Sequence, residues 1–188
     1  MPAAPRTDRP GQIRSRRPRS SALLALALVL LQSLTSAQDV SPLRLKAAFI
    51  WNFAKFTEWP ADALRAGEPF MMCVVGNAVV ADALRTAING RELANRPVSV
   101  LHVTPEEQPP GVCHVLFVSG VTAKQSVQIL NAVRDAPVLS ISDIEGAGQF
   151  GAMVEFLYEG GRLAFKVQPN AVKRSRLQIS SLVLKLSK

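Results

Sequence analysis

Short apolar runs alternate with amphipathic helical patterns through the middle of this chain, and this alternation constrains the fold more than any other feature. Strand-like runs lie at residues 70–75, 97–103, 114–118 and 138–141, and helical patterns lie at residues 77–88 and 122–134. Neighbouring parallel strands need a long crossover connection, which is usually a helix. The pattern therefore predicts an α/β fold with a largely parallel sheet flanked by helices on both sides.

The last third of the sequence changes character. Two strand-like runs, residues 152–158 and 162–167, flank a Glu-Gly-Gly turn signal. This arrangement predicts one antiparallel hairpin near the C-terminus. Two short helices are expected to follow, at residues 170–175 and 181–186.

A further amphipathic helix is predicted ahead of the first strand. Its apolar arc holds Leu43, Leu45, Phe49, Ile50, Phe53, Ala54 and Phe56. Ser41 is the expected N-cap and Pro42 the first helical position. The helix is expected to end before Pro60.

Two residues break the amphipathic pattern of this helix. Lys46 lies on the apolar arc, where its ammonium group must reach water along its aliphatic stem or find a carboxylate. Trp51 lies on the polar side, where its indole either covers a neighbouring loop as a half-buried ring or waits for a partner. The half-buried ring is the favoured interpretation, and contact with a partner, the alternative, makes Trp51 a candidate contact residue.

The first 37 residues have the pattern of a secretory signal peptide. Six arginines precede an apolar run at residues 22–31, and small residues precede a cleavage position near Ala37. The apolar run is too short to span a bilayer comfortably. We expect export by general secretion to the periplasm, leaving residues 38–188 as a single domain without internal repeats or a long linker.

The charge of the mature domain is modest. The whole chain carries 22 basic and 14 acidic residues, a formal net charge of +8. The leader holds six of the arginines and one aspartate, so the mature part has 16 basic and 13 acidic residues, a net charge of +3. The basic excess belongs mostly to the leader, and nucleic acid is not an expected partner.

Cys73 and Cys113 are the only cysteines of the chain. Each begins an apolar run, so the two could lie side by side at the same end of neighbouring strands. An even pair in an oxidising compartment favours a disulfide over two separate buried thiols. The bond would stabilise the fold by about 4 kcal/mol through loop closure.

Residues 146–151 match the G-x-G-x-x-G spacing of dinucleotide-binding loops letter for letter. In such loops a helix follows the glycines, and its N-terminus meets the pyrophosphate. Here the sequence after Gly151 reads as a strand. We therefore interpret the glycines as a flexible loop and not as a nucleotide site.

The sequence offers no convincing set of catalytic or metal-binding residues. His102 and His114, the only histidines, alternate with apolar residues, which favours half-buried structural roles. Ser119 lacks the G-x-S-x-G elbow of a nucleophilic serine. Asp143 follows a strand, where α/β proteins often bind ligands, but helix capping or pairing with Lys46 is the favoured interpretation. We predict that the protein is not an enzyme and uses no cofactor or metal.

Lys173, Arg174 and Arg176 form the only dense basic patch of the mature domain. A solvated helix face is the simpler interpretation. Contact with an acidic partner or an anionic ligand is the alternative, and it makes Arg174 and Arg176 candidate binding residues.

Segments spread in order along the mature chain resemble one family. They are residues 45–49 (LKAAF), 52–56 (NFAKF), 59–60 (WP), 73–76 (CVVG), 113–118 (CHVLFV), 138–143 (VLSISD), 151–154 (GAMV), 171–175 (AVKRS) and 177–181 (LQISS). Together they are similar to the YfiR-like periplasmic proteins, and the similarity covers almost the whole mature chain.

The resemblance implies regulation and not catalysis. The best-studied YfiR-like proteins restrain an inner-membrane diguanylate cyclase through its periplasmic domain, which lowers cyclic di-GMP, and an outer-membrane lipoprotein can sequester them. The resemblance also implies a homodimer and a disulfide matching Cys73 and Cys113. Some relatives have a second cysteine pair in the loop corresponding to residues 146–154, which this chain lacks. A periplasmic small-ligand sensor with an unidentified signalling partner is the alternative function.

Overall fold

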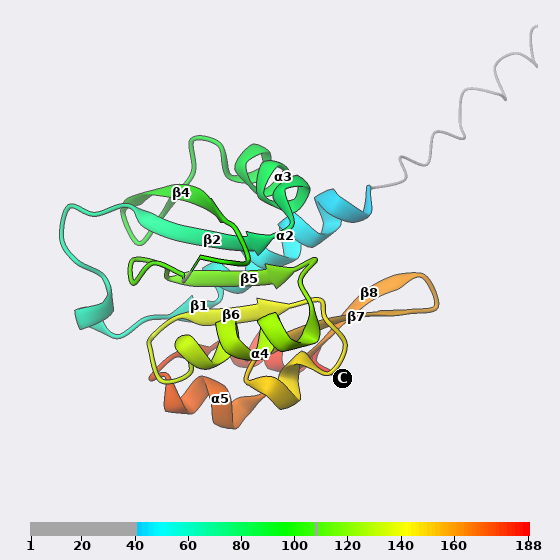
Figure 1. Cartoon of the computed structure of the whole chain (residues 1–188). Helices are drawn as coiled ribbons and strands as arrows, with labels where there is room; N and C mark the ends of the chain where they lie inside the picture. Colours follow the sequence, from blue (N-terminus) through cyan, green and yellow to red (C-terminus); the bar gives the residue numbers. More distant parts are fainter. Residues whose placement is uncertain (1–40, 108) are drawn as a thin grey trace, which may run out of the picture. The chain divides into compact units, whose positions relative to one another are not determined.

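The computed structural model describes residues 41–107 and 109–188 of the chain. The predicted leader, residues 1–37, lies outside the described residues, as does its cleavage position near Ala37. The described residues form a seven-stranded sheet, a separate two-stranded sheet and flanking helices (Figure 1).

The strands of the large sheet are β2 (Phe70–Gly76), β3 (Glu92–Leu93), β4 (Arg96–Val103), β5 (Val115–Ser119), β6 (Leu139–Ser142), β7 (Val154–Glu159) and β8 (Arg162–Val167). The helices are α2 (Pro42–Lys55), α3 (Ala78–Ile88), α4 (Ala123–Ala132), α5 (Pro169–Arg174) and α6 (Ser181–Leu184), with 3-10 turns η2 (Ala61–Ala63) and η3 (Ala147–Phe150). The two-stranded sheet pairs β1 (Thr57–Glu58) with β9 (Gln178–Ile179).

The large sheet has the order β3-β4-β2-β5-β6-β7-β8. The five strands from β4 to β7 in this order run parallel, and β3 and β8 are antiparallel to their neighbours. β7 and β8 form the predicted hairpin near the C-terminus, with Glu159 opposite Arg162 beside the turn. The predicted α/β fold with a largely parallel sheet is confirmed.

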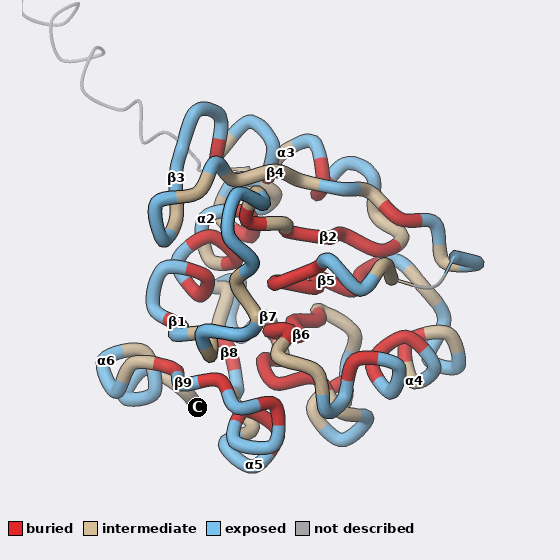
Figure 2. Tube along the Cα trace, turned by 90° about the vertical axis from the view of Figure 1, so that its left-hand side faces the viewer, coloured by how far each residue is buried: buried red, intermediate tan, exposed pale blue. Residues whose placement is uncertain are grey.

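Alternating side chains of the central strands supply two apolar clusters, one on each face of the sheet. In β2, Met72 and Val74 belong to one cluster, and Cys73 and Val75 belong to the other. The first cluster includes residues of α2, α3 and α5, and the second includes residues of α4 and η3. β5 and β6 are buried along their whole length (Figure 2), as expected for parallel strands covered on both faces.

Helix α2 begins at the predicted position but ends at Lys55, earlier than the predicted stop before Pro60. The next residues form β1, where Thr57 lies opposite Ile179 of β9. The Thr57 hydroxyl also donates a 2.7 Å hydrogen bond to the Phe53 carbonyl at the end of the helix. The prediction of a longer helix is wrong because a distant segment supplies a strand partner that local periodicity does not reveal.

A disulfide joins Cys73 in β2 to Cys113, which lies just before β5, with Cα atoms 5.8 Å apart. Because β2 and β5 are adjacent and parallel, the bond links two central strands of the sheet. Both cysteines are buried in the cluster that includes α4 residues. Cys73 lies inside its strand and not at the start, because β2 already begins at Phe70.

Candidate functional site

The carboxyl ends of β2 and β5 meet where the strand order of the sheet reverses. β4 lies on one side of β2 and β5 on the other, and α/β proteins commonly bind ligands outside such a switch point. In this protein the two strand ends approach closely. A Cβ added to Gly76, which has φ +87°, would lie 2.4 Å from the Ser119 carbonyl oxygen. Only glycine fits at this position.

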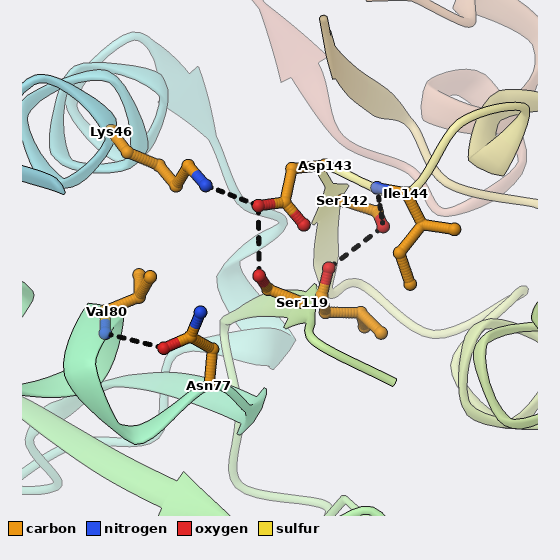
Figure 3. A network of polar contacts seen from close by, with 8 residues as sticks. Lys46, Asn77, Val80, Ser119, Ser142, Asp143 and Ile144 are labelled. Atoms are coloured by element: carbon orange, nitrogen blue, oxygen red, sulfur yellow. Dashed lines mark hydrogen bonds and ion pairs between the residues drawn. The ribbon is translucent and has the colours of Figure 1, made fainter. Parts of the chain in front are cut away.

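A polar network fills the region beside these strand ends (Figure 3). The Lys46 ammonium reaches from α2 to Asp143, just after β6, with Nζ 2.5 Å from Oδ2. The Ser119 hydroxyl donates a 2.9 Å hydrogen bond to the same carboxylate oxygen. The side chains of Lys46 and Asp143 are only 11% and 14% exposed. The predicted pairing of Lys46 with Asp143 is confirmed, and the network ties α2 to the sheet.

The glycine-rich residues 146–151 form an ordered turn. Gly146 begins it with φ 77°, and the 3-10 turn η3 follows. The Gly146 and Gly148 N–H groups donate hydrogen bonds of 2.8 and 3.1 Å to the two carboxylate oxygens of Glu155 on β7. A strand, β7, follows the glycines as predicted. The amides that would hold a phosphate in a nucleotide-binding loop here bind the protein's own carboxylate.

Both histidines make hydrogen bonds to the backbone. The His102 Nε2–H donates to the Gly76 carbonyl at 3.2 Å. His114 accepts from the Met71 N–H at Nδ1 and donates from Nε2 to the Ala63 carbonyl. Burial lowers the pKa of His114 below its usual range. These contacts agree with the structural roles predicted from the sequence.

Trp51 is buried, with 6% of its surface exposed, and belongs to the cluster of the α2 face. The Lys55 ammonium and the Arg91 guanidinium lie 5.9 and 5.7 Å from its ring centroid. The indole is more deeply buried than the half-buried ring expected from the sequence, and the candidate contact role of Trp51 stays a prediction. The physical reason for the deeper burial is that the turn after α3 brings Arg91 over the indole, so the polar side of α2 is covered at this point.

The basic patch divides into residues with different surroundings. Lys173 and Arg176 line a pocket of about 400 Å³, whereas Arg174 is exposed on α5 and lies outside this lining. The Arg176 guanidinium makes two hydrogen bonds of 3.0 Å to the Asp62 carboxylate. Arg176 has φ 59°, a left-handed conformation that is uncommon for a residue other than glycine.

We call this depression the C-terminal pocket. Its lining residues come from the end of β8, from α6 and from the segment that connects them: Val167, Pro169, Val172, Lys173, Arg176, Leu177, Gln178, Ile179 and Leu184. Aliphatic side chains supply most of the wall, and two cationic residues contribute positive charge. Such a surface can accept a small anion that has an apolar body.

Three exposed leucines lie at the C-terminal end of this region, and one of them, Leu184, also lines the pocket. Leu182 and Leu186 are 64% and 71% exposed, and Leu184 is 38% exposed. We call these three residues the leucine segment; α6 is drawn largely as exposed in Figure 2. The sequence analysis did not identify these leucines as candidate contact residues. The available signal was the alternation Leu-Val-Leu-Lys-Leu, whose Val183 alone packs against the core cluster.

Among residues 41–107 and 109–188, no group of three His, Cys, Asp or Glu side chains is arranged to hold a metal ion. Within the same ranges, no helix has the length and apolar character needed to cross a bilayer.

A comparison with protein families gives one match that covers most of the chain. A family model described as YfiR/HmsC-like matches residues 43–188, which include every helix and strand described above except the first residue of α2. The match also spans the disulfide, the C-terminal pocket and the leucine segment. The chain belongs to the YfiR/HmsC-like family.

Proposed function

We propose that this chain is an exported regulatory binding protein that restrains an inner-membrane diguanylate cyclase through its periplasmic domain and so lowers cyclic di-GMP. Family membership supports this function. A disulfide between two central strands suits an oxidising compartment. In this proposal the leader is removed near Ala37, and residues 38–188 act in the periplasm as a homodimer without catalysis. Sequestration by an outer-membrane lipoprotein would release the cyclase.

The observation that carries the docking role is the exposure of the leucine segment. Large apolar side chains that stay exposed close together in the chain can mark interaction sites, because covering them removes apolar area from water. Lys185 lies between Leu184 and Leu186 in the chain and is exposed. A partner with an apolar patch and acidic residues at its margin would complement this surface.

Removal of the leucine segment's exposed side chains tests this function. Deletion of the gene should raise cellular cyclic di-GMP, and the wild-type gene supplied in trans should restore the low level. The double variant Leu182→Ser and Leu186→Ser should fail to restore it, because the exposed side chains make few contacts within the fold but would be buried against the partner. Cyclic di-GMP is measured by mass spectrometry of cell extracts.

Val79→Ser is the matched control, because Val79 is 58% exposed on α3 and lies outside the leucine segment. This variant should restore the low cyclic di-GMP level. An unchanged cyclic di-GMP level after gene deletion would contradict the proposed restraint of a cyclase. If the leucine double variant restored the low cyclic di-GMP level fully, the cyclase function would still hold. The leucine segment would then not be its docking surface.

A second candidate function, a periplasmic small-ligand sensor, is favoured by the C-terminal pocket. Its apolar wall and Lys173 fit a small anionic compound, which would share Arg176 with the Asp62 carboxylate. A thermal-shift screen of anionic metabolites tests it, since a ligand at 100 times its Kd adds about 2.7 kcal/mol of stability. The shift should disappear in Arg176→Gln and persist in Arg174→Gln. A screen without any shift would count against this candidate.

A further inference from the structure

The seven-stranded sheet ends on one side in β8, and this edge is partly covered by the C-terminal residues of the chain. The Lys188 N–H donates a 3.1 Å hydrogen bond to the Phe165 carbonyl. The Val167 N–H donates to the Ser187 hydroxyl oxygen at 2.9 Å. Lys166 adds an exposed charge on the same strand. Covering segments and charged side chains both keep an edge strand from pairing with another chain.

The opposite side of the sheet is less protected. β3 pairs only with the first two residues of β4. Beyond them, the Val98 N–H donates a 3.1 Å hydrogen bond to the Arg91 carbonyl, and the Thr104 N–H binds the Glu107 carboxylate at 3.0 Å. Between these two contacts, no strand of the described chain pairs with the outer side of residues 99–103. We call residues 99–103 the open edge.

The backbone of the open edge has hydrogen-bonding groups that lack a partner. Successive residues of a strand direct their N–H and carbonyl groups to opposite sides. The Val98 N–H points away from β2, so the backbone groups of Val100 and His102 point away from it too, whereas those of Leu101 point toward β2. Two N–H groups and two carbonyl groups are therefore available for another strand.

The side chains of the open edge do not prevent such pairing. Its sequence, Ser-Val-Leu-His-Val, contains no acidic residue, lysine or arginine. Val100 packs against the cluster of the α2 face, and the neighbouring Leu101 is 36% exposed. Figure 2 shows β4 mostly as intermediate or exposed, in contrast to the buried β5. An apolar edge strand without charges is a template for pairing with another chain.

We propose that the open edge of β4 pairs antiparallel with the open edge of a second copy of this chain, so that two sheets join into one. The proposal rests on the homodimer of the proposed function and assigns the surface that forms it. A second copy fits because the open edge is bounded at both ends, by the contacts of Val98 and Thr104. A two-fold axis must map this segment onto itself, and its middle residue is Leu101.

The two-fold axis fixes the register of the pair. Leu101 lies opposite Leu101 of the second copy, and Val100 of each copy lies opposite His102 of the other. The four free backbone groups of each copy then form four hydrogen bonds across the axis. The two leucines form a pair without backbone hydrogen bonds, in which Cα atoms are about 4.5 Å apart. Pairing therefore covers an apolar side chain that the single chain exposes.

Charges placed at residue 101 test this register, because this residue faces itself. Leu101→Lys and Leu101→Glu should each raise the dimer dissociation constant about tenfold or more, since like charges then lie opposite each other. An equal mixture of the two variants should dimerise again through opposite charges. Analytical ultracentrifugation of the purified protein, with its disulfide intact, measures the dissociation constants.

Val79→Lys is the matched control, because Val79 is 58% exposed on α3 and lies outside the open edge. This variant should dimerise like the wild type. Dimers that persist in both Leu101 variants would overturn the interface and leave the homodimer standing. A mixture that stays monomeric would overturn the register. A monomeric wild type would contradict the homodimer itself, and the open edge would then be free for a strand of a different protein.

Amide exchange of the wild-type protein provides a second test that does not depend on the folding of the variants. The Val100 and His102 amides should exchange more slowly as the protein concentration rises, because only the dimer protects them. The Leu101 amide, which points toward β2, should be protected at every concentration. Dimerisation without added protection at Val100 and His102 would overturn the proposal. None of these results depends on whether a cyclase is restrained.

Discussion

At the residue scale, Lys46 places a charge on the apolar side of α2, where it needs a counter-ion. Its counter-ion, Asp143, comes from the end of β6, and both side chains are largely withdrawn from water. An ion pair of this kind adds little stability compared with an apolar pair of similar shape. Losing one member, however, leaves an uncompensated charge in a poorly hydrated place.

Asp143→Asn should lower the free energy of unfolding by about 3 kcal/mol, because the Lys46 ammonium loses its counter-ion while remaining near the core. Urea denaturation followed by circular dichroism measures the change. The double variant Lys46→Met and Asp143→Asn should recover part of the loss, since no charge is then left unpaired.

Arg85→Gln is the control for this pair, because Arg85 and its partner Asp82 are well exposed on α3. Its effect should stay below about 0.5 kcal/mol, the usual range for surface pairs. If Asp143→Asn were as mild as Arg85→Gln, the Lys46 charge would not depend on Asp143.

At the scale of elements, η3 and β7 are connected by a carboxylate that binds backbone amides. Glu155 lies in β7, yet its oxygens accept hydrogen bonds from Gly146 and Gly148 at the other end of the connection. The space beside Gly148 is already occupied, since an added Cβ would lie 2.7 Å from the Gln168 amide nitrogen. Glu155 therefore holds the turn through its backbone amides, and the Gln168 side chain fills the space beside Gly148.

Glu155→Ala should destabilise the protein by about 2 kcal/mol, because two amides lose a charged acceptor. Glu155→Gln keeps one oxygen and should cost about half as much. Hydrogen exchange should rise at the Gly146 and Gly148 amides in both variants. Glu159→Gln, in the exposed part of the same strand, is the control and should leave these amides protected. Unchanged protection in Glu155→Ala would contradict this role.

At the scale of the whole molecule, the disulfide joins Cys73 in β2 to Cys113 just before the adjacent strand β5, and the two cysteines are 40 positions apart in the chain. The closed segment contains α3, β3 and β4, which form one edge of the sheet together with its covering helix. The bond therefore limits the conformational freedom of this segment in the unfolded chain. Because the two sulfurs lie within a buried cluster, replacing them by small apolar side chains leaves the rest of the packing in place.

Cys73→Ala with Cys113→Ala should lower the unfolding free energy by about 4 kcal/mol, the value expected from loop closure. The comparison is made by urea denaturation with and without a reductant. The wild-type midpoint should fall in reductant, whereas the midpoint of the cysteine-free variant should not move. Equal wild-type midpoints under the two conditions would show that the bond contributes nothing to stability.

Several features could be predicted from the sequence because they depend on neighbours in the chain. The alternation of strands and helices, the hairpin formed by β7 and β8, and the N-terminus of α2 follow from periodicity and turn residues. The family resemblance could also be recognised from local segments, and the family match agrees with it. The pairing of Lys46 with a carboxylate followed from the cost of burying its charge.

Other features were decided only by contacts between segments far apart in the chain. β9 ends α2 early, Arg91 covers Trp51, Glu155 binds the glycine turn, and Asp62 holds Arg176 beside the C-terminal pocket. Local periodicity specifies which side of an element is apolar, because burial on folding favours one face. It does not specify which distant residue will lie opposite a given side chain. That choice depends on how the elements close around the core, and it is made by the tertiary structure.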